Sequence, residues 1–180
     1  EQALQKAGAN RPQLEAAISR VRPVRREGLE FLIVNMPDRD LASLGADFLL
    51  ENTDGAYEVM EKVPWGKQVP KDIFLNDILP YSCANERRDN WRRDFMAKFL
   101  PLVANCKTPA EAAARLNGEI FRVLGVRYST QRSKPDMSPY ECIDEKKASC
   151  SGLSILLVAA CRAVGVPARF AGIPMWPNNS

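Results

Sequence analysis

Apolar residues recur every three or four positions along the first 105 residues, and this spacing is typical of amphipathic helices. The periodic runs are Pro12 to Ser19, Pro23 to Asn35, about Leu41 to Lys62, and Trp91 to Asn105. Prolines stand between these runs, at positions 37, 64, 70 and 80, where each ends one helix or opens the next. The proline-spaced tract from Trp65 to Tyr81 predicts a short helix between loops. The first 105 residues are therefore predicted to be helical.

The clearest helix start lies at Thr108-Pro-Ala-Glu111. Thr108 is suited to cap the helix, proline favours the first helical position, and Glu111 completes a capping box. An apolar stripe follows and predicts core packing; its members are Leu116, Ile120, Val123 and Leu124. Gly125 is placed to end the helix, and Val126 to Tyr128 predict a brief extended piece.

The same cap pattern recurs at Ser138-Pro-Tyr-Glu141, after a polar loop from Ser129 to Asp136. It predicts a short helix that reaches about Lys147. We expect this helix to aim the loop that leads to Cys150.

An apolar run from Cys150 to about Val164 predicts a helix that is buried almost all round. Gly165 is the expected left-handed residue at its end, and Pro167 prevents the helix from continuing. Val166 to Ala171 then predicts a buried strand. Because one strand cannot satisfy its own backbone, we expect the partner strands of a sheet beyond Ser180.

Composition narrows the class of protein. The chain has 180 residues, of which 46% are hydrophobic, so it is predicted to be globular. Its net charge of +3 comes from 25 basic and 22 acidic residues mixed along the chain, which argues against nucleic acid as a partner. No stretch approaches the ~20 apolar residues that span a bilayer.

The densest basic cluster is Arg87-Arg88 with Arg92-Arg93, on either side of Trp91. It has two interpretations, a phosphate-binding patch or the solvated face of a helix. Alternating charges on a helix favour the solvated face.

The chain has five cysteines, Cys83, Cys106, Cys142, Cys150 and Cys161. An odd number without a C-x-x-C pair argues against a disulfide scaffold and against a zinc site, and predicts at least one free thiol. No acidic loop of calcium-binding type is present in the sequence either. We therefore expect neither a metal nor another cofactor.

Cys150 is the candidate for chemistry because it opens a helix. Unpaired backbone N–H groups and the helix dipole favour the thiolate there, which is the reactive form. The alternative is a small buried residue that begins a core helix, since free cysteines are often buried. The chain contains no histidine, so these residues do not complete a Cys-His pair. Cys161, three turns along the same helix, is predicted to be core packing.

The stretch from Ser138-Pro-Tyr-Glu141 through Cys150 to Ala160-Cys-Arg-Ala-Val-Gly-Val-Pro-Ala-Arg169 resembles the transglutaminase-like superfamily. Further upstream, the chain is similar to the helical N-terminal region of exported bacterial members. The residues that carry this second likeness are Ala7 to Arg11, Phe31 to Pro37 and Trp91 to Cys106.

The resemblance implies a papain-like core in which Cys150 attacks an amide or acyl carbonyl of a protein or peptide and forms a thioester. In that family a histidine and an aspartate follow on later strands, just past a segment like Gly172 to Trp176. These 180 residues would then be the N-terminal portion of such an enzyme and would not turn over alone. The alternative is a non-catalytic transglutaminase-like helical binding module.

The resemblance also predicts an organisation. Residues 1–105 would form a helical N-terminal region, and residues 106–180 the first, helical part of an α+β transglutaminase-like core. Trp176 either lines the substrate groove or plugs the edge of the domain. The same likeness predicts export to the periplasm or the cell surface.

Overall fold

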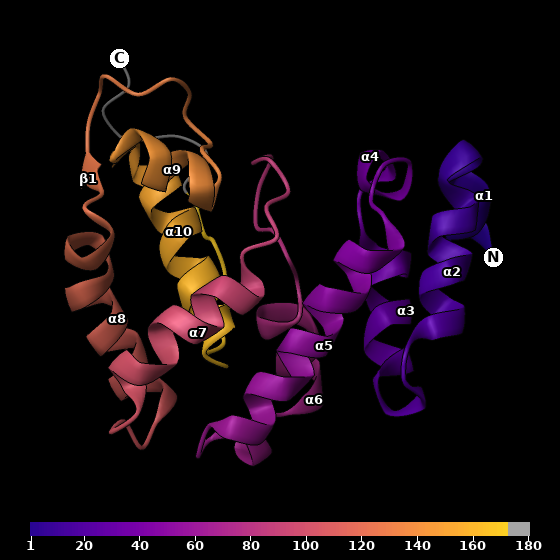
Figure 1. Ribbon diagram of the computed structural model, residues 1–180, viewed down its shortest axis with the longest axis horizontal. Coiled ribbons are helices and arrows are strands. Elements are labelled where there is room, and N and C mark those ends of the chain that lie inside the picture. The colour runs from indigo at the N-terminus through magenta and orange to yellow at the C-terminus, as the bar shows by residue number, and fades with distance from the viewer. Residues whose placement is uncertain (173–180) are drawn as a thin grey trace.

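The computed structural model describes residues 1–172, and over these residues the chain is mainly helical, as predicted. The described part has ten α-helices joined by turns and loops, and one parallel sheet of two very short strands. The N-terminal helices lie at one end of the molecule and α8 to α10 at the other, with α5 and α7 between them (Figure 1).

The N-terminal helices follow the predicted runs closely. Their bounds are α1 (Gln2–Lys6), η1 (Gly8–Asn10), α2 (Arg11–Arg20), η2 (Pro23–Arg25), α3 (Arg26–Asn35), α4 (Asp38–Leu41) and α5 (Ala46–Lys62). The run predicted from Leu41 to Lys62 is two helices, because Leu41 ends α4 and Gly45 is extended before α5 begins.

The proline-spaced tract was predicted to form one short helix between loops, and it forms three short helical pieces. They are the 3₁₀ turn η3 (Gly66–Gln68), α6 (Lys71–Ile73) and the π-helical turn η4 (Phe74–Ile78). A loop then leads to α7 (Arg92–Val103), which lies across the middle of the molecule.

The C-terminal elements are α8 (Pro109–Leu124), β1 (Arg127–Tyr128), α9 (Pro139–Glu145), β2 (Lys147–Ala148) and α10 (Cys150–Ala163). Thr108 caps α8 by accepting the N–H of Glu111, but the Glu111 carboxylate accepts the N–H of Lys107 rather than that of Thr108. Gly125 adopts the predicted left-handed conformation. Val123 does not belong to the buried stripe, because it is 46% exposed.

The strand predicted from Val166 to Ala171 is absent from the described residues, and that prediction is wrong. This segment finds its partners on helical elements: the N–H of Val166 donates to Cys161 and that of Ala168 donates to the carbonyl of Asp77, at 2.9 Å each. The indole N–H of Trp65 donates to Gly165 at 2.8 Å. The segment therefore docks onto η4, and Gly165 just before it docks onto Trp65, without a sheet.

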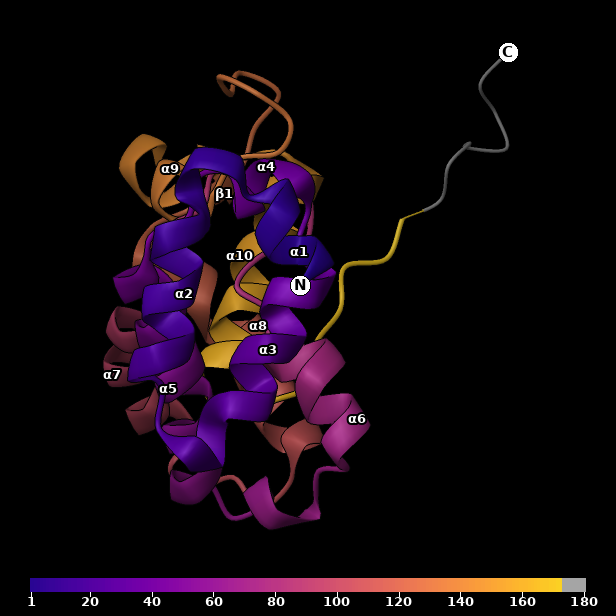
Figure 2. The ribbon, with the colours of Figure 1, turned by 90° about the vertical axis from the view of Figure 1, so that its right-hand side faces the viewer.

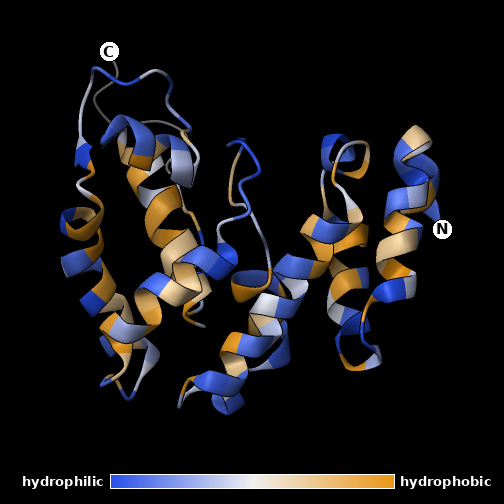
Figure 3. Cartoon of the chain, in the orientation of Figure 1, coloured by the Kyte–Doolittle hydropathy of each residue, from blue (hydrophilic) through white to orange (hydrophobic). Residues whose placement is uncertain are grey.

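Buried side chains form two clusters. One cluster joins α1 to α5 with η4, and the other joins the end of α5 with α7, α8, α9 and α10. Figure 3 shows apolar residues on the facing sides of the helices and hydrophilic ones on the outer sides. Helix α5 contributes to both clusters and so links them, and α7 packs against α5 and α10. The predicted boundary near residue 105 stays a prediction.

The expectation of a solvated arginine face is wrong for Arg92, which is 1% exposed. Its guanidinium donates to Asn52 Oδ1 at 2.7 Å, to the carbonyls of residues 78–80 at 2.9 to 3.2 Å, and to the carbonyl of Arg162 at 3.2 Å. Gly55 makes room for it on α5, since a Cβ there would lie 3.0 Å from Arg92 Cδ. Burial lowers the pKa of Arg92.

Candidate active site around Cys150

Cys150 is the first residue of α10, and its side chain is exposed. The interpretation of Cys150 as a buried core residue is therefore wrong. Ser149 precedes it as the helix cap: its hydroxyl oxygen accepts the N–H of Gly152 at 2.9 Å, and its carbonyl accepts the N–H of Leu153 at 2.9 Å. Within residues 1–172, no protein group accepts the N–H of Cys150 or Ser151. These two donors remain available beside the thiol.

The two-stranded sheet holds the chain just before Cys150. Strand β2 pairs in parallel with β1, with Arg127 opposite Lys147 and Tyr128 opposite Ala148. The N–H of Ser129 donates to Ala148 at 2.9 Å and extends the pairing by one residue. Strand β2 ends one residue before α10 begins, so the sheet fixes the position at which the helix starts.

Ser149 also ties the loop between β1 and α9 to this corner, since its hydroxyl donates to the carbonyl of Pro135. The loop projects beyond the helices at the end of the molecule where α10 begins (Figures 1 and 2). Ser149 itself is 3% exposed, so both of its contacts are sheltered from water.

Helix α9 supports the first turn of α10. Its N-terminus has the predicted capping box between Ser138 and Glu141. Lys146 ends the helix with a φ of 56°, which turns the chain into β2. Cys142 lies below Gly152 and its thiol is within 3.6 Å of the Gly152 carbonyl. A Cβ on Gly152 would lie 3.0 Å from Ala148 Cβ, so this close approach requires glycine.

The loop after η4 is anchored to the same region. The Asp89 carboxylate accepts the backbone N–H of Tyr140, in the first turn of α9, at 2.8 Å, and forms an ion pair with Arg87 at 2.7 Å. Through Asp89, the segment before α7 helps to hold the helix that supports the start of α10.

The other four cysteines are less accessible than Cys150. All five are free thiols, Cys142 and Cys161 are buried, and Cys83 and Cys106 are half-buried. Burial raises the pKa of Cys83, Cys142 and Cys161 to about 12. At pH 8 these three are thiolates in only about one molecule in 10⁴. The packing role predicted for Cys161 agrees with its burial.

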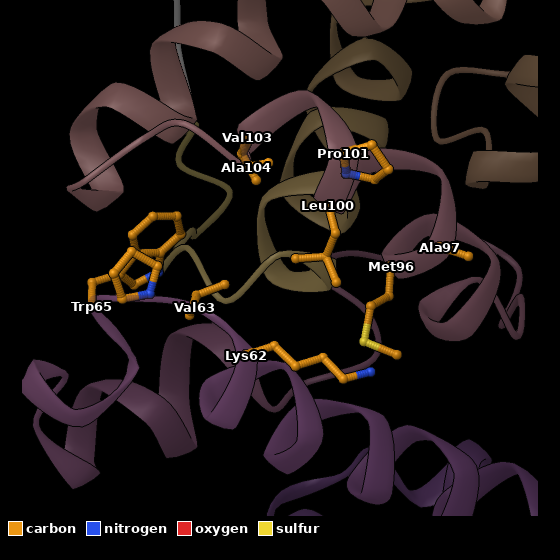
Figure 4. A pocket seen from close by; sticks show the side chains of 10 residues that line it. Lys62, Val63, Trp65, Met96, Ala97, Leu100, Pro101, Val103 and Ala104 are labelled. Carbon is orange, nitrogen blue, oxygen red and sulfur yellow. The ribbon is translucent and has the colours of Figure 1, made fainter.

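The cavity drawn in Figure 4 lies elsewhere. It has a volume of about 450 Å³ and lies between the end of α5 and α7, with Trp65, Leu100 and Pro101 in its wall and Lys62 beside it. Cys150 does not line it.

Trp176, the predicted groove residue, lies outside the described residues. Within the described part of the chain, no group of three or more histidine, cysteine or acidic residues is placed to hold a metal ion.

The geometry defines a mainly helical protein with an exposed cysteine at the start of a buried helix. Residues 98–179 match the family model of the transglutaminase-like superfamily, so this part of the chain is a transglutaminase-like superfamily domain. Membership indicates a family of cysteine-dependent enzymes that act on amides. Comparison with curated proteins and with solved structures gave no match.

The described helices include none that is long and apolar enough to cross a membrane.

Sequence reasoning missed three features of the site: strand β2, the bond from Ser149 to the loop, and the facing pair of Arg127 and Lys147. The signal for β2 is too weak to find, since two residues carry no periodicity. Ser149 stood in a recognisable cap position, one residue before the helix.

Proposed function

We propose that Cys150 is the nucleophile of a cysteine-dependent acyl transferase, amidase or peptidase that acts on protein or peptide amides. Its exposed thiol at the start of α10 carries the proposal, together with the superfamily match of residues 98–179. A cysteine is an effective nucleophile only as the thiolate. The N-terminus of a helix, where backbone N–H groups have no intrahelical partner, favours that form in general.

In the proposed reaction the Cys150 sulfur attacks the amide carbonyl carbon, and the carbonyl oxygen becomes an oxyanion. The free N–H groups of Cys150 and Ser151 are the donors next to that oxygen. The C–N bond then breaks, the amine leaves with a proton, and a thioester with Cys150 remains. Water or a second amine resolves it, which gives hydrolysis, deamidation or cross-linking.

These residues contain no histidine, so we propose that they supply the nucleophile but not the base, and that they form adducts without turnover on their own. Export to the periplasm or cell surface stays a prediction that rests on the likeness of the N-terminal helices.

The test is competitive alkylation of the full chain with iodoacetamide at pH 8, followed by peptide mass spectrometry of each cysteine. We expect Cys150 to react at least tenfold faster than Cys106, which is half-buried, and far faster than the buried Cys161. The variant Cys150→Ser should remove the fast phase and leave the rest unchanged. A Cys150 that reacts no faster than Cys161 would refute the proposal and favour the non-catalytic binding module.

A further inference from the structure

Two cations face one another on the strands that lead into the candidate site. Arg127 on β1 lies opposite Lys147 on β2 in the parallel register. Neighbouring strands are about 4.8 Å apart, and residues in register place their side chains on the same face of the sheet. Like charges that face one another in this way destabilise a strand pair. The pair therefore costs stability in the protein alone.

No carboxylate of the described residues forms an ion pair with either cation. The ion pairs of residues 1–172 include neither Arg127 nor Lys147, so no acidic oxygen there lies within 4.0 Å of their charged nitrogens. Helix α9 carries three acidic residues: Glu141 pairs with Lys134 at 2.8 Å, Glu145 accepts the hydroxyl and N–H of Ser133, and Asp144 is exposed and forms no ion pair within residues 1–172.

The cation pair is close to Cys150 along the chain. Lys147 precedes Cys150 by three residues, so their Cα atoms are at most about 11 Å apart. That distance is comparable with the Debye length of about 8 to 10 Å at physiological salt. Arg127 is exposed and Lys147 half-buried, so both can be reached from solvent. Figure 3 shows hydrophilic residues at β1 and along the loop that follows it.

We infer that Arg127 and Lys147 form a subsite for a carboxylate of the polypeptide substrate, close to the amide that Cys150 attacks. The inference rests on the proposed function and names its substrate class as acidic polypeptide segments. A guanidinium binds a carboxylate through two parallel hydrogen bonds, and the ammonium adds a mobile point charge. The bound carboxylate lies between two like charges and removes their repulsion.

The first test compares two alkylating agents of similar size at Cys150, anionic iodoacetate and neutral iodoacetamide. Their rate ratio reports the local electrostatic potential, because the thiolate fraction affects both rates equally. In Arg127→Gln/Lys147→Gln the ratio should fall about threefold at 10 mM salt, as two unit charges about 10 Å away in water predict. The fall should shrink in 1 M salt.

The matched control is Lys6→Gln/Arg20→Gln, which removes the same net charge from two exposed side chains on α1 and α2. These helices lie at the end of the molecule opposite β1 (Figure 1). The control should leave the ratio unchanged. An unchanged ratio in Arg127→Gln/Lys147→Gln would overturn the subsite, whereas slow alkylation of Cys150 by both agents in the unaltered chain would overturn the proposed function instead.

The second test measures binding of labelled peptides to the Cys150→Ser chain by fluorescence anisotropy. A peptide amide with glutamate side chains should bind at least threefold more tightly than its glutamine counterpart if side chains supply the carboxylate. If the C-terminus of the peptide supplies the carboxylate instead, a glutamine peptide with a free C-terminus should bind more tightly than the glutamine peptide amide. Equal binding of all three peptides would refute the subsite.

The variant Lys147→Glu tests whether a loss of preference for acidic peptides comes from the missing cation or from unfolding of the chain. It replaces the repulsive pair with a cross-strand ion pair to Arg127, so the thermal midpoint should stay equal or rise. The preference for acidic peptides should nevertheless be lost. A Lys147→Glu chain that is folded and still prefers acidic peptides would overturn the inference.

Discussion

Arg92 is predicted to be the most costly single arginine to replace in this protein. Its guanidinium is fully enclosed, and it donates to α5, to carbonyls at and just after the end of η4, and to the end of α10. No carboxylate of the described residues pairs with it, so its charge is balanced by carbonyl and amide oxygens and by the Trp91 ring, whose centroid lies 4.7 Å from the guanidinium carbon.

The magnitude follows from the acceptors that Arg92→Ala would leave behind. The carbonyls of Leu79 and Pro80 keep another donor, Asn52 and Arg162 respectively. The carbonyl of Ile78 and the Oδ1 atom of Asn52 lose the guanidinium and keep no other side-chain donor among the described residues. An unsatisfied buried acceptor costs about 1 to 3 kcal/mol, and the cavity adds to this. We expect a loss of about 3 to 6 kcal/mol in the free energy of unfolding.

The assay is urea unfolding followed by circular dichroism, with Arg93→Ala as the matched control. Arg93 is the next residue on α7, but its side chain is 42% exposed and pairs with Glu58 at the surface. Exposed pairs contribute about 1 kcal/mol or less, so the control should unfold near the midpoint of the unaltered chain. If Arg92→Ala and Arg93→Ala had equal unfolding free energies, the reasoning about buried acceptors would be refuted.

Three further predictions concern packing and pH. Gly152→Ala should cost about 1 to 3 kcal/mol, because its Cβ would crowd β2, whereas Gly118→Ala, which meets no atom within 4 Å, should gain about 0.5 to 1 kcal/mol in the same unfolding assay. Thr53→Val should raise the unfolding free energy by about 1 kcal/mol, since the buried hydroxyl has no partner in the described part of the chain. Burial raises the pKa of Cys142 and Cys161 from 9.0 to about 12, so the folded state keeps their protons longer and the thermal midpoint should fall between pH 9 and pH 12.

Each of these has an outcome that would contradict it. Equal stability of the Gly152 and Gly118 variants would show that α10 moves freely away from β2. A destabilised Thr53→Val chain would mean that its hydroxyl has a partner in solution. A thermal midpoint that stays constant up to pH 12 would mean that neither buried thiol is sheltered from ionisation.

Local signals in the sequence predicted the elements that position the site. The caps Thr108 and Ser138 begin α8 and α9, and Gly125 and Gly165 are left-handed, as expected. Each of these signals depends only on residues that are close together in the chain, so the sequence alone is enough to predict the helix ends. The start of α10 at Cys150 was predicted for the same reason.

Features set by distant partners were not predictable. Val166 to Ala171 has the composition of a strand, but its backbone is satisfied by a carbonyl 91 residues earlier, that of Asp77, through the N–H of Ala168. The sequence around Arg92 predicts a surface charge, and only the folded structure shows that the carbonyls of residues 78–80 accept its hydrogen bonds. The pattern of charges along the chain does not show which charged side chains distant residues bury.

The contacts of Arg162 and its neighbours have a consequence for how the protein is made. Arg162 donates to the carbonyls of Pro80 and Ser82, and Trp65 reaches Gly165, so α10 ends on residues that were synthesised some 80 to 100 positions earlier. Contacts over such separations close long loops, which costs chain entropy and slows folding. The N-terminal helices leave the ribosome before α10 does. Helix α10 therefore reaches its final position only after its partners between Trp65 and Ser82 have been synthesised.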